Sequence, residues 1–429
     1  MENPADDVTP IIDGRPIPLK PAFRFAGLSG DLWRLALVVG VAQFSMSVWT
    51  WQFGIYIETL IEPWQMGITF TASSVAGLLG VPISGYISDF IGRKKTLLLA
   101  YIPMALGLAL LFTFPIWPYL PIFYGLVQFG WSFVVIMARA APADQISQDG
   151  GKDAARTFTM ALVPAFAMDG LSPLFASLLL MSGFPQRNLL IIGGFGTVIA
   201  FIVSVKYVRE TLSKETREKA RAGPIISLRG LGRDFWILAL GMSQFAFCFG
   251  MAFSYIGNLV VNDLPFGWGV DAATWGIIWS ASSLTIAAIS YYGGELADKK
   301  MKLGLSVALA FNILFIFAMA NGNGVWFLFF LNVGWSFFIV IWIGAERAFV
   351  VQGVREEMKG RALSTYQALM STVQIFAMNL GAYIWTLSGS LRYLWNVSAL
   401  IGGIGLIGIL YALKSIQLKP IDEPDSFVQ

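Results

Sequence analysis

Twelve apolar stretches separated by short polar segments run along this chain, and they constrain its fold more than any other feature. An α-helix of about 20 apolar residues crosses the hydrocarbon core of a bilayer, where every backbone N–H and C=O group must find a partner within the protein. The expected spans are 32–60, 68–88, 96–114, 118–140, 157–181, 187–207, 235–261, 273–297, 303–320, 324–349, 362–387 and 392–413. The sequence therefore predicts an all-α membrane protein with twelve transmembrane helices.

The composition supports this class of protein. Hydrophobic residues make up 56% of the 429 residues and charged residues only 13%, against about 25% in an average soluble chain. So few charges cannot cover a water-facing surface, and no soluble basic domain is left to bind nucleic acid. The chain has no histidine and a single cysteine, Cys248, which excludes histidine chemistry and an intrachain disulfide framework. We expect no enzyme activity, no cofactor and no metal site.

The basic residues mark one side of the membrane. With twelve spans, all Lys and Arg residues except Arg187 and Arg392 fall in the tails, the central connection or the loops of one face, and Arg139 is counted among them. Because Lys and Arg collect on the cytoplasmic side of membrane proteins, both termini are predicted to be cytoplasmic. We expect a multi-pass protein of the plasma membrane, with cytoplasmic tails at 1–30 and 414–429 and a cytoplasmic linker at 209–233.

Short sequence matches relate the first half of the chain to the second. Gly130–Phe133 recurs at Gly334–Phe337, Phe166–Asp169 at Phe376–Asn379, Gln43–Phe44 at Gln244–Phe245, and Gly85–Asp89 in altered form at Gly294–Asp298. A shift by six helices keeps the orientation of each span, so the two repeats are parallel. The repeats predict two six-helix bundles, 31–208 and 234–413, related by a pseudo-two-fold axis.

The polar segment between the second and third spans carries a motif. It contains Gly85, Asp89, Gly92, Arg93 and Lys94, and the glycine before the cations permits a tight turn. With its flanking apolar helices, this pattern resembles the loop between the second and third helices of major facilitator superfamily transporters. An ordinary basic loop between membrane helices is the alternative interpretation.

The resemblance implies the two-bundle fold of that family and a rocker-switch mechanism, in which the bundles alternate access to a central site. It also implies that Asp89 meets the start of the eleventh helix near Arg361 when the cytoplasmic side is closed. The later copy, with Asp298 followed by Lys302, is expected to act in the same way but more weakly.

Asp169 is the acidic residue nearest to the middle of a span, and Pro164 and Pro173 flank it. A charged group at this depth is costly and indicates a functional site. We interpret Asp169 as a proton or cation site. The alternative is a protonated side chain that hydrogen-bonds to a neighbouring helix and has no other role.

Other residues within the spans are candidates for solute contacts or gates. Glu58 is either a solvated helix end or part of a cavity or gate, while Glu346 and Arg347, near Arg361, form either an inner gate or an ordinary interfacial pair. The neutral candidates are Gln43, Gln52, Gln128, Gln244, Asn258, Gln374 and Asn379, together with Trp49 and Trp335 as cavity walls or packing residues.

These features predict a secondary active transporter, since no ATP-binding motif is present. No Lys or Arg is expected in the middle of the membrane, which weakens an anionic substrate. We expect a monomer in the lipid bilayer that carries out proton-coupled symport of a small neutral polar solute, such as a sugar. The alternatives are proton-coupled efflux of lipophilic cations and, from another class, a membrane sensor or lipid-handling protein on the same scaffold.

The predicted orientation can be tested by thiol labelling. A Ser213→Cys substitution in a Cys248→Ser background places a lone accessible thiol in the central linker. This thiol should be shielded from membrane-impermeant reagents in intact cells and should react after permeabilisation. Labelling in intact cells would overturn the cytoplasmic assignment.

Overall fold

The computed structural model describes residues 11–12, 15–16, 24–25, 27–148, 154–210, 231–352 and 359–416. Most of the predicted tails 1–30 and 414–429 and of the linker 209–233 lies outside these ranges. The side chains of Asp89, Asp298 and Arg361 also lie outside the described set. Two short antiparallel strand pairs precede the first helix, β1 (Ile11–Ile12) with β2 (Arg15–Pro16) and β3 (Arg24–Phe25) with β4 (Leu28–Ser29).

The first half of the chain forms six long helices. They are α1 (Gly30–Glu58), α2 (Pro63–Ile91), α3 (Arg93–Thr113), α4 (Leu120–Gln148), α5 (Ala154–Met181) and α6 (Leu189–Tyr207), with the 3-10 turn η1 (Gln186–Asn188) before the last of them. Local signals start some of these helices. The Ser29 side chain caps α1 by accepting from the Leu32 N–H at 3.3 Å, and α2 begins at Pro63 after a Glu62–Gln65 capping box.

The second half repeats this arrangement with one additional short helix. Its elements are α8 (Arg233–Phe253), α9 (Ile256–Val261), α10 (Ala272–Lys299), α11 (Met301–Asn321), α12 (Val325–Gln352), α13 (Lys359–Ser388) and α14 (Leu391–Ser415). The described residues contain twelve helices that are long and apolar enough to cross a membrane. The prediction of twelve spans is confirmed.

The seventh span differs from the expected continuous helix over 235–261. Helix α8 ends at Phe253 and α9 begins at Ile256, so Ser254 and Tyr255 interrupt the span. The Tyr255 hydroxyl donates to the Met378 carbonyl at 2.9 Å, and the Ser254 hydroxyl donates to the Gly250 carbonyl at 3.0 Å. These contacts satisfy polar groups at the break, as a membrane interior requires.

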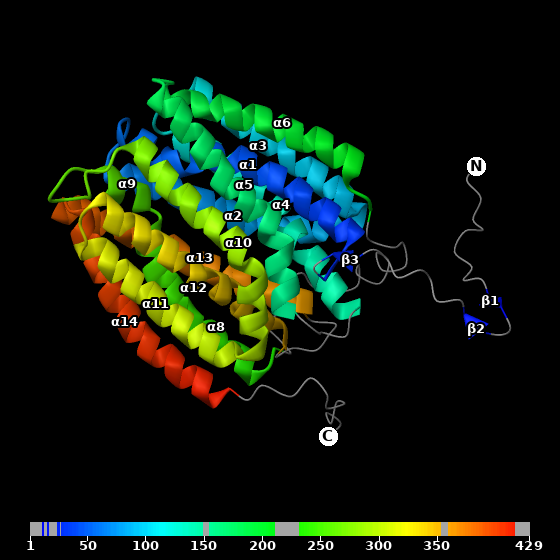
Figure 1. Cartoon of the computed structure of the whole chain (residues 1–429). Coiled ribbons are helices and arrows are strands. Elements are labelled where there is room, and N and C mark those ends of the chain that lie inside the picture. The colour runs from blue at the N-terminus through cyan, green and yellow to red at the C-terminus, as the bar shows by residue number, and fades with distance from the viewer. Residues whose placement is uncertain are drawn as a thin grey trace.

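The helices pack as two groups, one from each half of the chain (Figure 1). In the first, α1 packs on α5 and α6, α2 on α4, and α3 on α4 and α6. In the second, α8 packs on α13 and α14, α10 on α12, and α11 on α12 and α14. The two groups meet mainly where α5 lies along α10 and α2 lies along α13. We call these two interfaces the α5–α10 seam and the α2–α13 seam.

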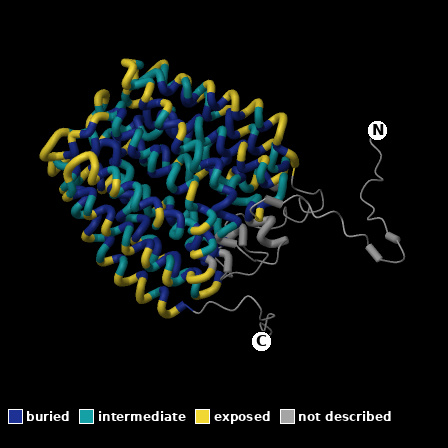
Figure 2. The backbone as a smooth tube through the Cα atoms, in the orientation of Figure 1, coloured by how far each residue is buried: buried dark blue, intermediate teal, exposed yellow. Residues whose placement is uncertain are grey.

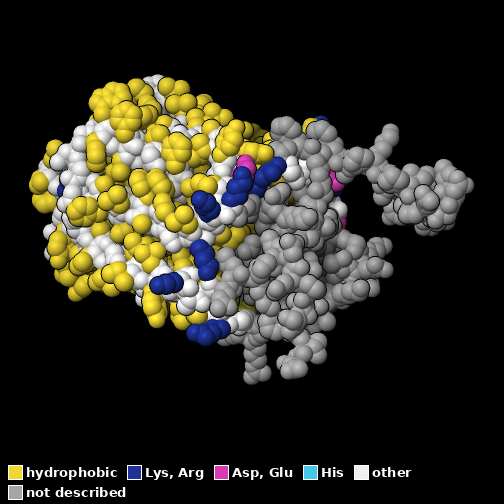
Figure 3. Space-filling model, turned by 60° about the horizontal axis from the view of Figure 1, so that its bottom comes forward, with side chains coloured by type: hydrophobic (Ala, Val, Ile, Leu, Met, Phe, Trp, Pro, Cys, Tyr) yellow, Lys and Arg dark blue, Asp and Glu magenta, His cyan; other side chains and the backbone are white. Residues whose placement is uncertain are grey.

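The outside of the molecule is apolar, as a lipid-facing surface must be. Large hydrophobic side chains such as Phe195, Ile202, Phe330, Ile407 and Tyr411 are exposed, and Figure 2 shows exposed positions distributed along the outer helices. Lys and Arg side chains gather at one end of the molecule (Figure 3). We call the end at which α1 begins and α14 ends the tail side, and the other end the far side.

The motif between α2 and α3 forms a turn of one residue. Gly92 ends α2 and begins α3 with φ of +96°, a conformation that favours glycine, which confirms the tight turn expected there. The Glu210 carboxylate, which follows α6, accepts from the Arg93 N–H at 3.0 Å. The described part of the motif thus joins α3 to the end of α6.

Cations cap helix ends reciprocally within each bundle. At the tail side, Lys94 at the start of α3 donates to the Val205 carbonyl of α6 at 2.8 Å. At the far side, Arg187 before α6 donates to the Phe112 carbonyl at the end of α3, at 2.9 Å from Nε, and lies 4.8 Å from the Phe112 ring centroid. Each helix of this antiparallel pair therefore begins with a cation that satisfies the C-terminal carbonyls of the other.

The second bundle has the same pair of caps. Lys302 at the start of α11 donates to the Ile416 carbonyl after α14. Arg392 at the start of α14 donates to the Ala320 carbonyl of α11 at 3.2 Å and to the Gly267 carbonyl at 2.9 Å. The two cations that the sequence places on the far side thus have one shared structural role, and the motif position Lys302 acts as a helix cap.

Loss of a far-side cap should destabilise the protein. Arg187→Gln is expected to lower the free energy of unfolding by about 1–2 kcal/mol, because a partly buried cation stabilises a helix C-terminus by about that amount. Thermal unfolding of the purified protein in detergent measures the change. Lys95→Gln, at an exposed position of α3, is the control. Equal shifts in the two variants would show that the cap contributes nothing specific.

Candidate functional site

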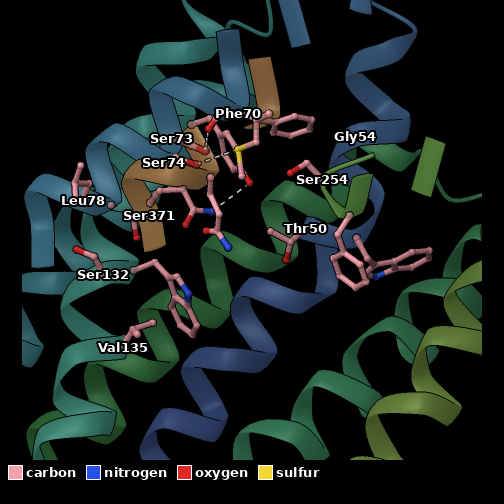
Figure 4. Close-up of a pocket in the computed structure, with 18 of the residues that line it drawn as sticks. Thr50, Gly54, Phe70, Ser73, Ser74, Leu78, Ser132, Val135, Ser254 and Ser371 are labelled. Carbon is pink, nitrogen blue, oxygen red and sulfur yellow. Dashed lines mark hydrogen bonds between the residues drawn. The ribbon is translucent and has the colours of Figure 1, made fainter. Parts of the chain in front are cut away.

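Two adjacent cavities that share part of their lining lie between the bundles, and we call them the large lobe and the small lobe of the central cavity. The large lobe has a volume of about 390 Å³ and the small lobe about 290 Å³, and Thr50, Trp51, Gln128, Trp131 and Ile256 line both. Hydroxyl and amide groups are frequent in the large lobe, where Ser73, Ser74, Ser132, Ser254, Asn258, Ser371 and Gln374 accompany the aromatic residues Phe70, Tyr124 and Phe253. Figure 4 shows Thr50, Ser73, Ser74, Ser254 and Ser371 around this space. The cavity offers polar groups and aromatic faces to one solute.

The small lobe contains Asp169, with four tryptophan side chains around it. Trp51, Trp131, Trp275 and Trp279 line this lobe together with Gln43, Ser47 and Asp169. Such rings provide apolar faces on which a ligand can pack. The lobe therefore combines one carboxylate with a largely aromatic wall.

Asp169 accepts hydrogen bonds from both bundles. Its Oδ1 accepts from the Gln43 amide at 3.1 Å and from the Ser47 hydroxyl, both on α1. Its Oδ2 accepts from the Ser283 hydroxyl of α10 at 2.7 Å. The ion pairs of the described residues do not include Asp169. The carboxylate is thus solvated by neutral donors in place of water, and one of these donors belongs to the opposite bundle.

Glu58 joins the bundles at the far side of the cavity. Its two carboxylate oxygens accept from Asn258 of α9 at 2.6 Å and from Asn262, the residue directly after α9, at 2.9 Å. The approach is close, since a Cβ on Gly54 would lie 2.8 Å from the Asn258 Oδ1. Of the two interpretations of Glu58, the geometry favours a role between the bundles over a solvated helix end.

Gln52 makes a second contact on the far side. It is buried, and its amide donates to the Ala272 carbonyl at the start of α10 at 3.0 Å. Gln186 donates to the Gln52 carbonyl at 3.2 Å. Gln52 therefore lies beside the cavity as an inter-bundle contact.

A charged cluster lies at the tail side of the cavity. The Tyr366 hydroxyl donates to Glu346, and the positive charges of Arg139 and Arg347 act on the same carboxylate. Arg139 Nη1 donates to Gln367 of α13, so this cluster also connects the two bundles. The predicted inner gate at Glu346 and Arg347 therefore has a partner from the first bundle, Arg139.

The position of Arg139 corrects the sequence analysis. Arg139 lies within the membrane-spanning part of α4, Leu120–Pro142, and its side chain lines the large lobe. Counting Arg139 among the cations of the loops is therefore wrong. The expectation that no Lys or Arg lies in the middle of the membrane stays a prediction, because Arg139 lies near the tail-side end of its span. A position near the end of an apolar run does not show whether a long side chain extends to the membrane surface or back into the protein.

Four of the predicted neutral residues line the cavity. Gln43, Gln128, Asn258 and Gln374 do so, and Gln128 lies at the boundary between the lobes, where it donates to the Tyr124 hydroxyl at 3.2 Å. Gln374 packs closely on α8, since a Cβ on Gly250 would lie 3.0 Å from its Cγ.

Four other candidates lie away from the lobes. Gln244 is exposed and faces α14, where a Cβ on Gly405 would lie 3.0 Å from its Cβ, and Asn379 is an exposed residue of the α2–α13 seam that donates to Thr71. Trp49 packs against Phe53 and Tyr124, while the Trp335 indole donates to Asn312 at 2.7 Å. Among the described residues that line the two lobes, none of these four is found.

The two seams relate Asp169 to the second half in a register that differs by one residue from the sequence match of Phe166–Asp169 with Phe376–Asn379. Ser283 donates to Asp169 in the α5–α10 seam, and Ser74 donates to the Met378 sulfur at 3.3 Å in the α2–α13 seam. One constant residue shift relates Ser74 to Ser283 and Asp169 to Met378. The structural counterpart of Asp169 is therefore Met378, one residue before the predicted Asn379.

Several site residues carry weak signals in the sequence. Ser47 and Ser283 are single hydroxyls in apolar helices, and Asn262 follows the predicted span. The run of Ser280, Ser282 and Ser283, close to Gly276, is a detectable signal, because small residues mark close helix contacts in membranes.

The family model of the Major Facilitator Superfamily matches residues 35–378, most of the chain. The chain belongs to this superfamily. This agrees with the twelve helices and the two-bundle arrangement, and it confirms the resemblance carried by the motif at Gly85–Lys95. A search of curated proteins found no match.

Solved transporters share the fold. The human organic anion transporter MFSD10 (TETRAN) has a TM-score of 0.67 at 15% identity, with 89% of this chain and all of that chain covered. The nucleoside transporter NupG, in a mutant form, has a TM-score of 0.71 at 14% identity, with the same coverage. At these identities the likeness concerns the fold alone. Family and fold together identify this chain as a multi-pass membrane protein and as a secondary transporter.

The Glu58 contact should bias the bundles toward closure on the far side. Glu58→Ala removes the acceptor shared by Asn258 and Asn262. We expect about a tenfold loss in the ratio of closed to open forms, because a hydrogen bond to a charged group contributes about 1.5–3 kcal/mol. Spin labels at the exposed residues Leu60 and Leu264 report the separation between the bundles.

A neighbouring acid provides the control. Glu62→Ala removes a carboxylate that caps α2 within its own bundle. The distance between the labels should lengthen in Glu58→Ala and stay at the parental value in Glu62→Ala. An unchanged distance in Glu58→Ala would contradict the gate role.

Proposed function

We propose that this protein carries out proton-coupled transport of a small neutral polar organic solute by alternating access, with Asp169 as the proton-binding residue. The observation that carries the proposal is the position of Asp169, which lines the cavity and at the same time joins α5 to α10. The Asp169 carboxyl group can therefore contact the solute, bind the proton and act on the interface between α5 and α10.

The lining of the cavity supports a neutral polar solute. Gln128, Asn258 and Gln374 supply both donors and acceptors, and hydroxyl groups surround them. Aromatic faces such as those of Trp51 and Trp131 can pack on a ring whose edges carry hydroxyl groups. Sugars and nucleosides have this chemistry, and the structurally similar NupG is described as a nucleoside transporter.

Inter-bundle contacts on both sides of the cavity support alternating access. Glu58 with Asn258 closes the far side, and Arg139 with Gln367 lies at the tail side. A rocker-switch motion requires that such contacts break on one side while those on the other side hold.

The position of Arg139 in the cavity lining supports an organic anion as the second candidate substrate class. Its guanidinium group lines the large lobe and can bind a carboxylate or phosphate. The structurally similar MFSD10 is described as an organic anion transporter. Glu346 and Gln367 already interact with Arg139, which is the reason for ranking this substrate class second.

Transport into proteoliposomes tests the proposal. A thermal-shift screen of sugars, nucleosides and organic anions first identifies a bound solute. The radiolabelled form of this solute is then used for the uptake measurements. The parent protein should accumulate this solute under an imposed pH gradient. Asp169→Asn should retain binding and solute exchange but lose accumulation down to the level measured without a gradient. An imposed sodium gradient at constant pH tests the other coupling ion.

A surface acid serves as the matched control. Glu295 pairs with Lys299 at the exposed tail-side end of α10, so Glu295→Gln should accumulate solute as the parent does. Gradient-driven uptake at the parental rate in Asp169→Asn would refute the coupling role. Binding without any transport by the parent would instead support a sensor on the same scaffold.

A further inference from the structure

The two seams between the bundles have matching hydrogen bonds with different acceptors. In the α5–α10 seam, Ser280 donates to the Gly170 carbonyl and Ser283 donates to Asp169. In the α2–α13 seam, Ser74 donates to the Met378 sulfur. A thioether is a weak, uncharged acceptor, whereas a carboxylate accepts charge-assisted bonds. Only the Asp169 bond among these three changes strength when a proton binds.

The α5–α10 seam is closely packed along its length. A Cβ on Gly170 would lie 2.6 Å from Leu284 Cγ, one on Gly276 2.2 Å from the Ser177 hydroxyl, and one on Gly294 2.8 Å from the Arg156 Cα. Helices at this separation depend on each contact between them, because no lipid or water can replace a contact that is lost.

The two oxygens of Asp169 divide between the bundles. Oδ1 bonds to Gln43 and Ser47 within the same bundle, and Oδ2 bonds to Ser283 across the seam. A proton on the carboxyl group removes the charge that strengthens all three bonds, which roughly halves the strength of each. Only the bond to Ser283 transmits this change to the other bundle.

Other charged and titratable groups on the helices around α5, among the described side chains, do not bond to Asp169. They are Asp31, Arg34, Tyr56 and Glu58 of α1, Tyr124 and Arg139 of α4, Tyr291, Tyr292, Glu295 and Lys299 of α10, and Glu346 and Arg347 of α12, with Arg156 on α5 itself. The hydrogen bonds that Asp169 makes within the described part of the chain involve none of them. One of them, Glu58, bonds across the bundles at a different place, to Asn258 and Asn262.

We propose that the Asp169–Ser283 hydrogen bond is a proton-sensitive latch that holds the α5–α10 seam closed while Asp169 is ionised. The described side chains of the α2–α13 seam form no such latch. The inference rests on the proposed proton-binding role of Asp169. Protonation from the cavity releases the latch, so the proton loosens one seam and leaves the other unchanged. The proton thereby makes the motion of the bundles asymmetric.

Pulsed electron paramagnetic resonance distances between spin labels in each seam test the latch. The distance between labels at Met181 and Ala272 reports the width of the α5–α10 seam at its far-side end. The distance between labels at Trp64 and Leu387 does the same for the α2–α13 seam. All measurements use full-length protein in nanodiscs, without solute, in a Cys248→Ser background. As the pH falls, the first distance distribution should shift to longer values and the second should stay constant.

Three variants separate the latch from general packing. Ser283→Ala and Asp169→Asn should give the longer α5–α10 distance at every pH. Ser280→Ala is the matched control: it removes a neutral bond in the same seam, so the pH-dependent shift should persist.

The outcomes distinguish the latch from the coupling proposal. Equal shifts in both seams, no shift in the parent, or a parental shift in Ser283→Ala would each refute the latch. Parental accumulation in Asp169→Asn would refute proton coupling at this residue, whatever the distances show.

Discussion

A carboxylate in the middle of a membrane helix must be satisfied by the protein, and in this structure both bundles contribute to satisfying Asp169. Gln43 and Ser47 donate from α1, and Ser283 donates from α10. Without these donors an ionised side chain at this depth costs several kcal/mol. One carboxylate therefore faces the cavity and also bonds across the tightly packed seam between α5 and α10. This connection between ion, cavity and interface makes the arrangement suitable for a coupled transporter.

Around this asymmetric site the scaffold is symmetric. Lys94 and Arg187 cap the α3–α6 pair reciprocally, and Lys302 and Arg392 cap the α11–α14 pair in the same way. These caps tie the outer helices together within each bundle, as the proposed rocker-switch motion requires. Two differences between the halves lie where the bundles meet. One is Asp169 in place of Met378, and the other is the break in the seventh span, after which Asn258 and Asn262 bond to Glu58.

The sequence predicted the fold well because the bilayer allows few alternatives. Length and hydropathy determine the spans, and the loop motif with Gly92 identifies the superfamily. The site was predicted less completely. Asp169 and Glu58 could be found, since an acid within an apolar run is conspicuous. The partner Ser283 could not be chosen among the many serines, because helix rotation decides which hydroxyl faces the seam. Rotation also explains why Gln244 faces α14, and the conformation of a long side chain explains why Arg139 lines the cavity.

The central claim is that Asp169 exchanges a proton within the membrane, and infrared difference spectroscopy tests it most directly. Spectra of the protein reconstituted in lipid are recorded as the pH is lowered, for the parent and for Asp169→Asn. The account predicts a C=O absorption of a protonated carboxyl group in the parent that is missing from the variant. Identical difference spectra for the two proteins would contradict it, because the protons would then be bound elsewhere.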